Sequence, residues 1–235
     1  MKGIWDPLGR RLWLAETVFV GASALLFGLR GDWAAFWTCV GSLFLVAAPV
    51  VLPKLLGIRL SKVFFICCML YALGPMLGKA YRLYYLTSWW DKLLHTMGGV
   101  VFAAIGMGVA RKLGADKGLS ILFGFFFSVA VSGLWELFEF GMDTFFGMDM
   151  QNDRIVHSIH SYVLGDAPGT MGLLENIREV TVNGMPLELG GYLDIGLIDS
   201  MGDMLVETVG AAVFVLYARF SAGAGPVYPP NAKKD

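Results

Sequence analysis

The chain has 235 residues, of which 56% are hydrophobic and 16% charged, and its mean hydropathy is +0.63. One soluble core of this size does not need so much apolar surface, so the composition indicates an integral membrane protein. The net charge of −1 gives no indication of a nucleic-acid partner, and the sequence has no zinc-finger spacing, P-loop or dinucleotide-binding glycine motif.

Six apolar segments are long enough to cross about 30 Å of hydrocarbon as helices. They cover residues 12–29, 33–52, 61–79, 90–110, 119–140 and 200–219. Arg10 and Arg11 precede the first segment, but no small-residue cleavage site follows it, so we interpret it as an anchor helix. The fold class that we predict is all-α: a polytopic membrane helix bundle that forms a single integral membrane domain over residues 1–235.

The distribution of basic residues predicts the orientation of this bundle. With a cytoplasmic N-terminus, twelve of the 18 Lys and Arg residues fall in cytoplasmic segments, and every short loop agrees. We therefore expect both termini in the cytoplasm. Aromatic residues that lead into the fourth segment are typical of an interface belt on the outer side: Tyr81, Tyr84, Tyr85, Trp89 and Trp90.

Residues 141–198 form one long connection that is too polar and glycine-rich to span a membrane. Acidic residues dominate it, so we predict an acidic extracytoplasmic cap. Within it, "REVTVNGMPLELGG" alternates apolar residues around Asn183-Gly184, which predicts a small β-hairpin with a two-residue turn. Pro186 would make its strand an edge strand. The Gly- and Pro-rich tail after the sixth segment is expected to be disordered.

Polar residues occur in pairs at helical spacing on three of the segments. The pairs are Asp91 with His95, Glu136 with Glu139, and Asp199 with Asp203; Asp143 follows the second pair, and Glu207 lies deeper than the third. Residues three or four apart share a helix face, so the members of each pair can point in one direction. The predicted topology puts all three pairs at the outer membrane face. We therefore expect them to converge on one outward-facing cavity.

These pairs differ in how well ordinary helix-end chemistry explains them. Asp91 and Asp199 stand at helix starts, where capping and the helix dipole favour a carboxylate without any function. Glu136 and Glu139 stand in last turns, where the dipole is already negative, and they repel each other. Glu207 lies about 12 Å of helical rise beyond Asp199, a depth at which an ionisable residue is taken as functional. These carboxylates need protons or a positive partner.

Many oxygens with one imidazole suit a hard or borderline divalent ion such as Mg²⁺, Mn²⁺, Ca²⁺ or Fe²⁺. The predicted ligands are Asp91, His95, Glu136, Glu139, Asp199 and Asp203. His95 or Glu136 is the expected catalytic base, and Glu207 and Asp143 would relay protons or support the ligands. His157 and His160 could add ligands, whereas Cys39, Cys67 and Cys68 are interpreted as apolar side chains without a functional role.

Three motifs carry a family resemblance: "WDKLLHTMGG" at residues 90–99, "LWELFEF" at 134–140 and "DSMGDMLVETVGA" at 199–211. Together they resemble the YjdF-like family of small bacterial inner-membrane proteins, over roughly the C-terminal two thirds of the chain. The chain is more distantly similar to VanZ-like proteins, which share "DKLLH". The resemblance implies a bacterial plasma-membrane protein whose polar motif positions include the three pairs, while Glu207 and the long cap depart from both patterns. The more distant similarity to VanZ-like proteins suggests an envelope-related role in tolerance to teicoplanin-type glycopeptides.

The residues leave three functions open. The leading hypothesis is a metal-dependent membrane enzyme that hydrolyses a lipid or lipid-linked envelope substrate or transfers a group on it. The second is a proton- or cation-coupled transporter that uses Glu207, Asp203 and Glu139, although the fourth and sixth segments are nearly apolar beyond the site. The third is a non-catalytic envelope binding or immunity protein. Whether the protein is an enzyme, and its oligomeric state, are left open by the sequence.

Overall fold

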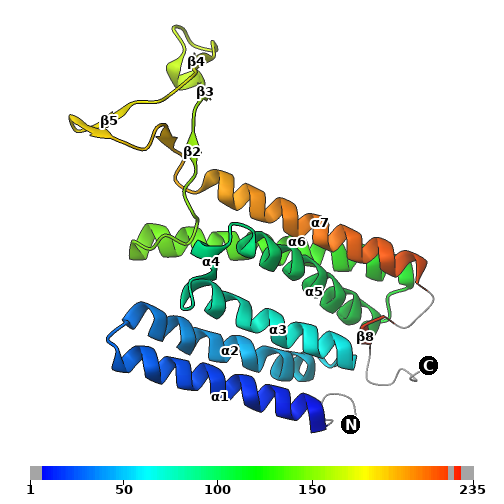
Figure 1. Ribbon diagram of the computed structural model, residues 1–235. Helices are drawn as coiled ribbons and strands as arrows, with labels where there is room; N and C mark the ends of the chain where they lie inside the picture. Colours follow the sequence, from blue (N-terminus) through cyan, green and yellow to red (C-terminus); the bar gives the residue numbers. More distant parts are fainter. Residues whose placement is uncertain (1–6, 222–224, 229–235) are drawn as a thin grey trace. The chain divides into compact units, whose positions relative to one another are not determined.

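A computed structural model describes residues 7–221 and 225–228 of the chain. Six helices in it are long and apolar enough to cross a membrane, which confirms the predicted polytopic helical fold (Figure 1). They are α1 (Pro7–Leu29), α2 (Trp33–Leu56), α3 (Lys62–Lys79), α5 (Trp90–Lys112), α6 (Lys117–Phe146) and α7 (Leu197–Phe220). The short helix α4 (Leu83–Leu86) lies in the segment that we expected to be an interface belt.

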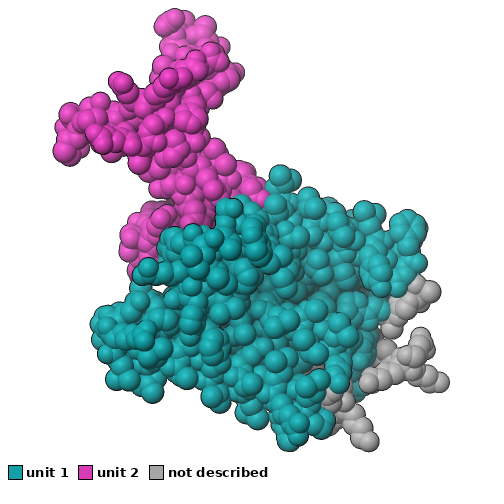
Figure 2. Space-filling model, viewed as in Figure 1, with its two compact units in different colours: residues 1–134, 203–235 teal, residues 135–202 magenta. Residues whose placement is uncertain are grey.

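The chain divides into two compact units, which Figure 2 shows in different colours. Unit 1 comprises residues 1–134 and 203–235, and unit 2 comprises residues 135–202. The division passes through α6 and α7, so each of these helices contributes to both units. The placement of the units relative to one another is not determined, and each is therefore described by itself.

Local sequence signals set the ends of the helices in unit 1. The Asp32 carboxylate accepts a hydrogen bond from the Ala35 backbone N–H at 3.1 Å and so caps α2. That helix ends at Gly57, whose φ of +61° is the left-handed conformation that glycine adopts most readily. The Ser61 hydroxyl caps α3 in turn by accepting from the Phe64 N–H at 3.3 Å.

The core of unit 1 lies between its helices. Helix α1 packs on α2, α2 on α3, and α3 on α5, as Figure 1 shows. Buried apolar side chains from these helices and from α7 form one cluster, which includes Val20, Val46, Met69, Ala103 and Phe214. The three cysteines are free thiols; Cys39 and Cys68 are buried and Cys67 is exposed.

Small residues bring α6 close to α5 in unit 1. The buried positions of α6 before residue 135 are Ser120, Gly124, Ser128 and Ser132. They are spaced four residues apart, and none is larger than serine. A methyl group on Gly124 would meet the Ala103 carbonyl oxygen at 2.6 Å, and the Ser128 hydroxyl donates to the Gly99 carbonyl at 3.1 Å. Small side chains at helix contacts are how membrane helices approach closely.

A short strand pair closes one end of unit 1. Strand β1 (Arg59–Leu60) pairs antiparallel with β8 (Val227–Tyr228), and β8 packs on α5 at Gly108. The sequence did not predict this pair, because two-residue strands carry no alternating pattern. It also corrects the expected disordered tail at residues 227–228; residues 222–224 and 229–235 of that tail lie outside the described residues.

Unit 2 contains the end of α6, the cap and the start of α7. The predicted hairpin is confirmed: β5 (Val180–Val182) pairs with β6 (Met185–Leu187), and both Asn183 and Gly184 have the positive φ of a type I′ turn. The structure has two further strand pairs that were not predicted. Strand β2 (Ile155–Val156) pairs with β7 (Tyr192–Leu193), and β3 (Ile159–Ser161) pairs with β4 (Gly172–Leu174). The 3-10 turn η1 (Tyr162–Leu164) follows β3. Helix α6 extends to Phe146, beyond the predicted end at residue 140, so Asp143 is helical.

Candidate functional site

Glycines bring α5 and α7 into backbone contact in unit 1. A methyl group on Gly99 of α5 would collide with the Glu207 carbonyl oxygen, and one on Gly210 of α7 would collide with the Thr96 carbonyl oxygen. Only residues without a Cβ allow this approach. The contact places the polar residues near the start of α5 beside those of α7.

Two aspartates share one lysine at this contact. The Lys92 ammonium donates to Asp203 Oδ1 at 2.8 Å and lies 3.3 Å from Asp91 Oδ2. The Asp203 side chain is 2% exposed, whereas that of Lys92 is 28% exposed. A carboxylate so deeply buried needs a charged or protonated partner, and Lys92 supplies one.

The imidazole of His95 lies among three carboxylates. Its Nε2 atom is 3.8 Å from both Asp91 Oδ1 and Asp203 Oδ1, and its Nδ1 atom is 3.6 Å from Glu207 Oε2. These distances are ion-pair separations and exceed hydrogen-bond length. We call Asp91, Lys92, His95, Asp203 and Glu207 the α5–α7 cluster. It holds three carboxylates against one ammonium, so it attracts further positive charge.

Tyr71 of helix α3 lies beside the Glu207 end of the same cluster. A Cβ on Gly98 would lie 2.9 Å from the Tyr71 hydroxyl and 3.6 Å from the Glu207 carboxyl carbon, so these two groups approach the same glycine. The buried Oε1 atom of Glu207 has no hydrogen-bond partner among the described residues. A buried carboxylate oxygen without a donor is either protonated or able to accept a cation.

The cluster meets the first requirements of a metal site. Asp91, His95 and Asp203 each offer one ligand atom, and these atoms lie within 4.8 Å of one another. Two aspartate oxygens and one imidazole nitrogen form a donor set that suits Mn²⁺ or Fe²⁺ and is acceptable to Mg²⁺. Glu207 stands behind His95, as a carboxylate commonly stands behind a metal-binding histidine. Lys92 occupies the space between the two aspartates, so an ion would have to compete with its ammonium group.

The remaining predicted ligands belong to unit 2. Glu136 and Glu139 are buried, and Glu139 Oε1 accepts from the Trp135 indole N–H at 2.9 Å. Because the two units are not placed relative to each other, the convergence of these glutamates with the α5–α7 cluster stays a prediction.

Asp199, at the start of α7, is bound by residues of the cap. Its carboxylate accepts from Arg154 Nη2 at 2.8 Å and from both the backbone and side-chain nitrogens of Asn152 at 3.1 Å. Asp143 likewise accepts from the Met150 and Gln151 backbone N–H groups, at 2.7 and 2.9 Å. These hydrogen bonds are the kind that anchor loops to helix ends. His157 Nδ1 lies 3.0 Å from the Ile177 carbonyl oxygen.

Sequence reasoning missed Lys92, Tyr71 and Arg154. The first was counted only as a topology signal, although its position between Asp91 and His95 marks it as the nearest cation to the predicted ligands. The other two approach from distant parts of the chain, so no local pattern reveals them.

A further buried carboxyl lies far from the cluster in the sequence. Glu16 of α1 is 5% exposed, and neither of its carboxylate oxygens has a hydrogen-bond partner among the described residues. It shares the buried face of α1 with Val20, Ser23 and Ala24. The sequence interpretation passed over it, because it stands alone in its segment.

Comparison with known proteins places the chain in a family. We found no match among curated proteins and none among solved structures. A family defined as predicted membrane proteins, DUF2238, matches residues 11–223, which is most of the chain. With its six apolar helices and this match, the chain belongs to the DUF2238 family of predicted membrane proteins.

Proposed function

We propose that the protein is a metal-dependent membrane enzyme that hydrolyses, or transfers a group on, a lipid or lipid-linked envelope substrate. The observation that supports it is the approach of the Asp91, His95 and Asp203 ligand atoms to within 4.8 Å of one another. Asp91 is the second residue of α5, and Asp203 is the seventh of α7. Residues so near the ends of spanning helices lie close to the level of lipid headgroups.

In this proposal Asp91, His95 and Asp203 hold a divalent ion such as Mg²⁺ or Mn²⁺. Such an ion, when bound, would polarise a phosphoryl or carbonyl oxygen and activate a water molecule. Glu207 would orient the His95 ring by accepting a hydrogen bond from the His95 Nδ1–H group, once the present Nδ1–Oε2 separation of 3.6 Å shortens. Lys92 would turn its partly exposed ammonium away from the aspartates and toward an anionic headgroup.

The roles that we propose for residues of unit 2 rest on the sequence alone. If the units meet at the cluster, Glu136 would take the proton of the attacking water, and Glu139 and Asp199 would enter the ligand set. The resemblance to YjdF-like and VanZ-like proteins supports a place in the bacterial plasma membrane and a substrate of the envelope. The same basic-residue distribution supports cytoplasmic termini.

The test is product formation by the purified full chain from an extract of envelope lipids, followed by mass spectrometry. We expect activity that needs a divalent cation and is lost in Asp203→Asn and His95→Gln. The matched control is Asp116→Asn, which changes a carboxylate that caps the Leu119 N–H at the start of α6. Cation-independent activity, or equal activity of Asp203→Asn and the control, would contradict the proposal.

A second candidate function is proton-coupled transport. It is supported by Oε1 of Glu207 and both carboxyl oxygens of Glu16, which have no hydrogen-bond partner within residues 7–221 and 225–228, since ionisable groups in spanning helices commonly form proton relays. Substrate-dependent acidification in proteoliposomes that disappears in both Glu207→Gln and Glu16→Gln would favour it over the enzyme. Acidification that neither change alters would remove it.

A further inference from the structure

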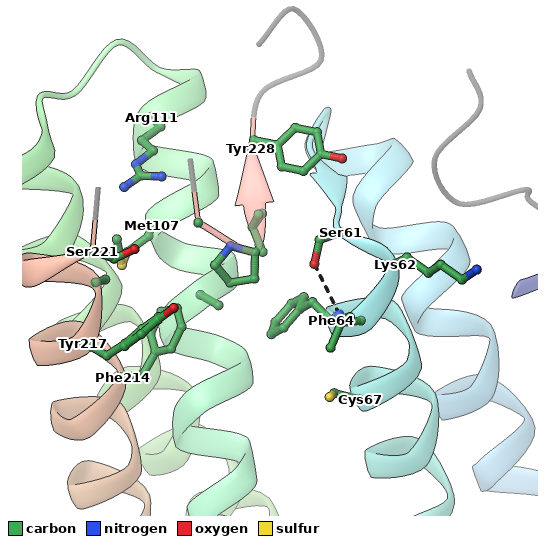
Figure 3. Close-up of a pocket in the computed structure, with 16 residues that line it drawn as sticks. Ser61, Lys62, Phe64, Cys67, Met107, Arg111, Phe214, Tyr217, Ser221 and Tyr228 are labelled. Carbon is green, nitrogen blue, oxygen red and sulfur yellow. Dashed lines mark hydrogen bonds between the residues drawn. The ribbon is translucent and has the colours of Figure 1, made fainter. Parts of the chain in front are cut away.

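A cavity of about 670 Å³ lies in unit 1, at the ends of three spanning helices (Figure 3). The start of α3, the ends of α5 and α7, and strand β8 form its walls. Arg111 lies 19 positions beyond Lys92 of the α5–α7 cluster, which is about 28 Å of helical rise. The members that come nearest along α7, Glu207 of the cluster and Phe214 of the cavity, are seven positions or about 10 Å of rise apart. The size of the cavity is within the usual range of small-molecule sites.

The lining changes from polar to apolar with depth. Ser61, Ser221 and Arg111 stand at the helix ends, and Cys67, Ala104 and Phe214 line the cavity deeper in the same three helices. Six or seven residues separate the two levels on each helix, which is about 10 Å of helical rise. This gradient matches an amphipathic ligand whose polar head lies at the membrane surface.

The polar level carries positive charge. The Arg111 side chain extends from α5 toward Ser221 and Met107, whereas Lys62 points away from the other lining residues (Figure 3). Arg111 Nη1 lies 3.2 Å from the position that a Cβ on Gly225 would occupy, so the guanidinium lies beside the segment that leads into β8. Of the lining residues that the structure describes, none is acidic. The cavity therefore favours an anionic head.

The apolar level is accessible from the lipid side of the helices. Cys67 is exposed and Tyr217 is 66% exposed, and both line the cavity. They belong to helices that are long and apolar enough to cross a membrane, where exposed side chains would meet hydrocarbon. An apolar cavity at this depth does not hold water well. An acyl chain is the occupant that the bilayer itself supplies.

We propose that this cavity binds one phospholipid with an anionic headgroup. Its phosphate contacts Arg111, and an acyl chain lies along Cys67, Phe214 and Tyr217. Arginine suits this role because its planar guanidinium donates two parallel hydrogen bonds to phosphate oxygens. The site is independent of the proposed catalysis, so either proposal can fail without the other.

The experiment is native mass spectrometry of the full chain in detergent, titrated with phosphatidylglycerol or with phosphatidylcholine of the same acyl chains. We expect one phosphatidylglycerol per chain, bound at least about tenfold more tightly than phosphatidylcholine. Arg111→Gln should remove this preference, and Arg111→Lys should retain part of it. The matched control is Arg219→Gln, which removes an exposed arginine at the end of α7 that does not line the cavity.

A native thiol gives a second readout that does not depend on any substitution. Cys67 is exposed and lines the cavity, whereas Cys39 and Cys68 are buried. Phosphatidylglycerol should slow maleimide labelling of Cys67 severalfold, and the same concentration of inorganic phosphate should not. Equal binding of both lipids, an unchanged preference in Arg111→Gln, or protection by inorganic phosphate alone would overturn the proposal.

Discussion

The α5–α7 cluster and the cap use the same kind of residue in different ways. In the cap, backbone N–H groups and an arginine satisfy the carboxylates: Asp194, for example, accepts from the Arg154, Gly196 and Ile198 N–H groups. In the cluster, Asp203 faces the Lys92 ammonium and the His95 ring. A carboxylate held by backbone donors is committed to structure, because the donors cannot move away. One held by side chains can exchange its partner for an ion.

The largest expected effect comes from separating the two helices that form the cluster. Gly99→Leu would push α5 away from the Glu207 backbone, and we expect it to destabilise unit 1 by about 3 kcal/mol or to prevent folding. Thermal unfolding in detergent measures this. The control is Gly41→Leu on α2, where a Cβ meets nothing within 4 Å. Equal melting temperatures for both variants would show that the α5–α7 contact is not close.

Removing the arginine that pairs with Asp199 should loosen unit 2 and leave the α5–α7 cluster intact. Arg154→Ala takes from buried Asp199 its charged donor, at an expected cost of about 1–2 kcal/mol, reduced because the Arg154 side chain is 46% exposed. Hydrogen exchange of residues 147–196 is the measurement. Arg178→Ala, an exposed arginine of the same cap, is the control. A loss of metal binding in Arg154→Ala would contradict the separation of roles.

Within the cluster, Glu207 is expected to act through His95. Glu207→Gln should weaken divalent-ion binding by about tenfold, because supporting carboxylates typically contribute 10- to 100-fold to metal affinity. Calorimetric titration with Mn²⁺ measures the effect. Affinity that is unchanged in Glu207→Gln would leave Glu207 as a proton site unrelated to the ion.

The smallest effect concerns the one cap carboxylate that other carboxylates surround. Burial, and then Asp149, Asp194 and Asp143, raise the pKa of Asp153 above its ordinary value. Because the pKa is higher in the folded state than in the unfolded state, ionisation of Asp153 lowers the free energy of unfolding at high pH. This loss disappears as the pH falls below the pKa of the unfolded state, where the carboxyl is protonated in both states. Asp153→Asn should therefore slightly stabilise the cap at neutral pH and change nothing near pH 3. Cap hydrogen exchange at the two pH values tests this; a loss of protection at neutral pH would contradict it.

Long apolar runs and turn residues made most of the fold predictable. The six spans and the Asn183-Gly184 hairpin follow from local patterns. The two-residue strands and α4 do not, because they are too short for any periodicity. The end of α6 was placed too early because Gly141 and Asp143 look like a loop, although Phe145 and Phe146 continue the helix.

The sequence predicted which site residues share a helix face, and it did not predict which residues from other parts of the chain bind them. Helical spacing put Asp91 beside His95, and the close α5–α7 contact brings Asp203 and Glu207 to them. The Asp199–Arg154 pair joins residues 45 positions apart, so local spacing could not show that Asp199 has a cap partner. Whether Glu136 and Glu139 reach the cluster depends on how the two units are arranged.

Mn²⁺ titration of the purified full chain, with Lys92→Gln and Asp203→Asn beside the wild type, tests the central claim most directly. The proposed site predicts one ion per chain, weaker binding in Asp203→Asn, and tighter binding in Lys92→Gln because the competing ammonium is gone. If Lys92→Gln binds no ion, or if Asp203→Asn binds as well as the wild type, the α5–α7 cluster is a structural ion pair and not a metal site.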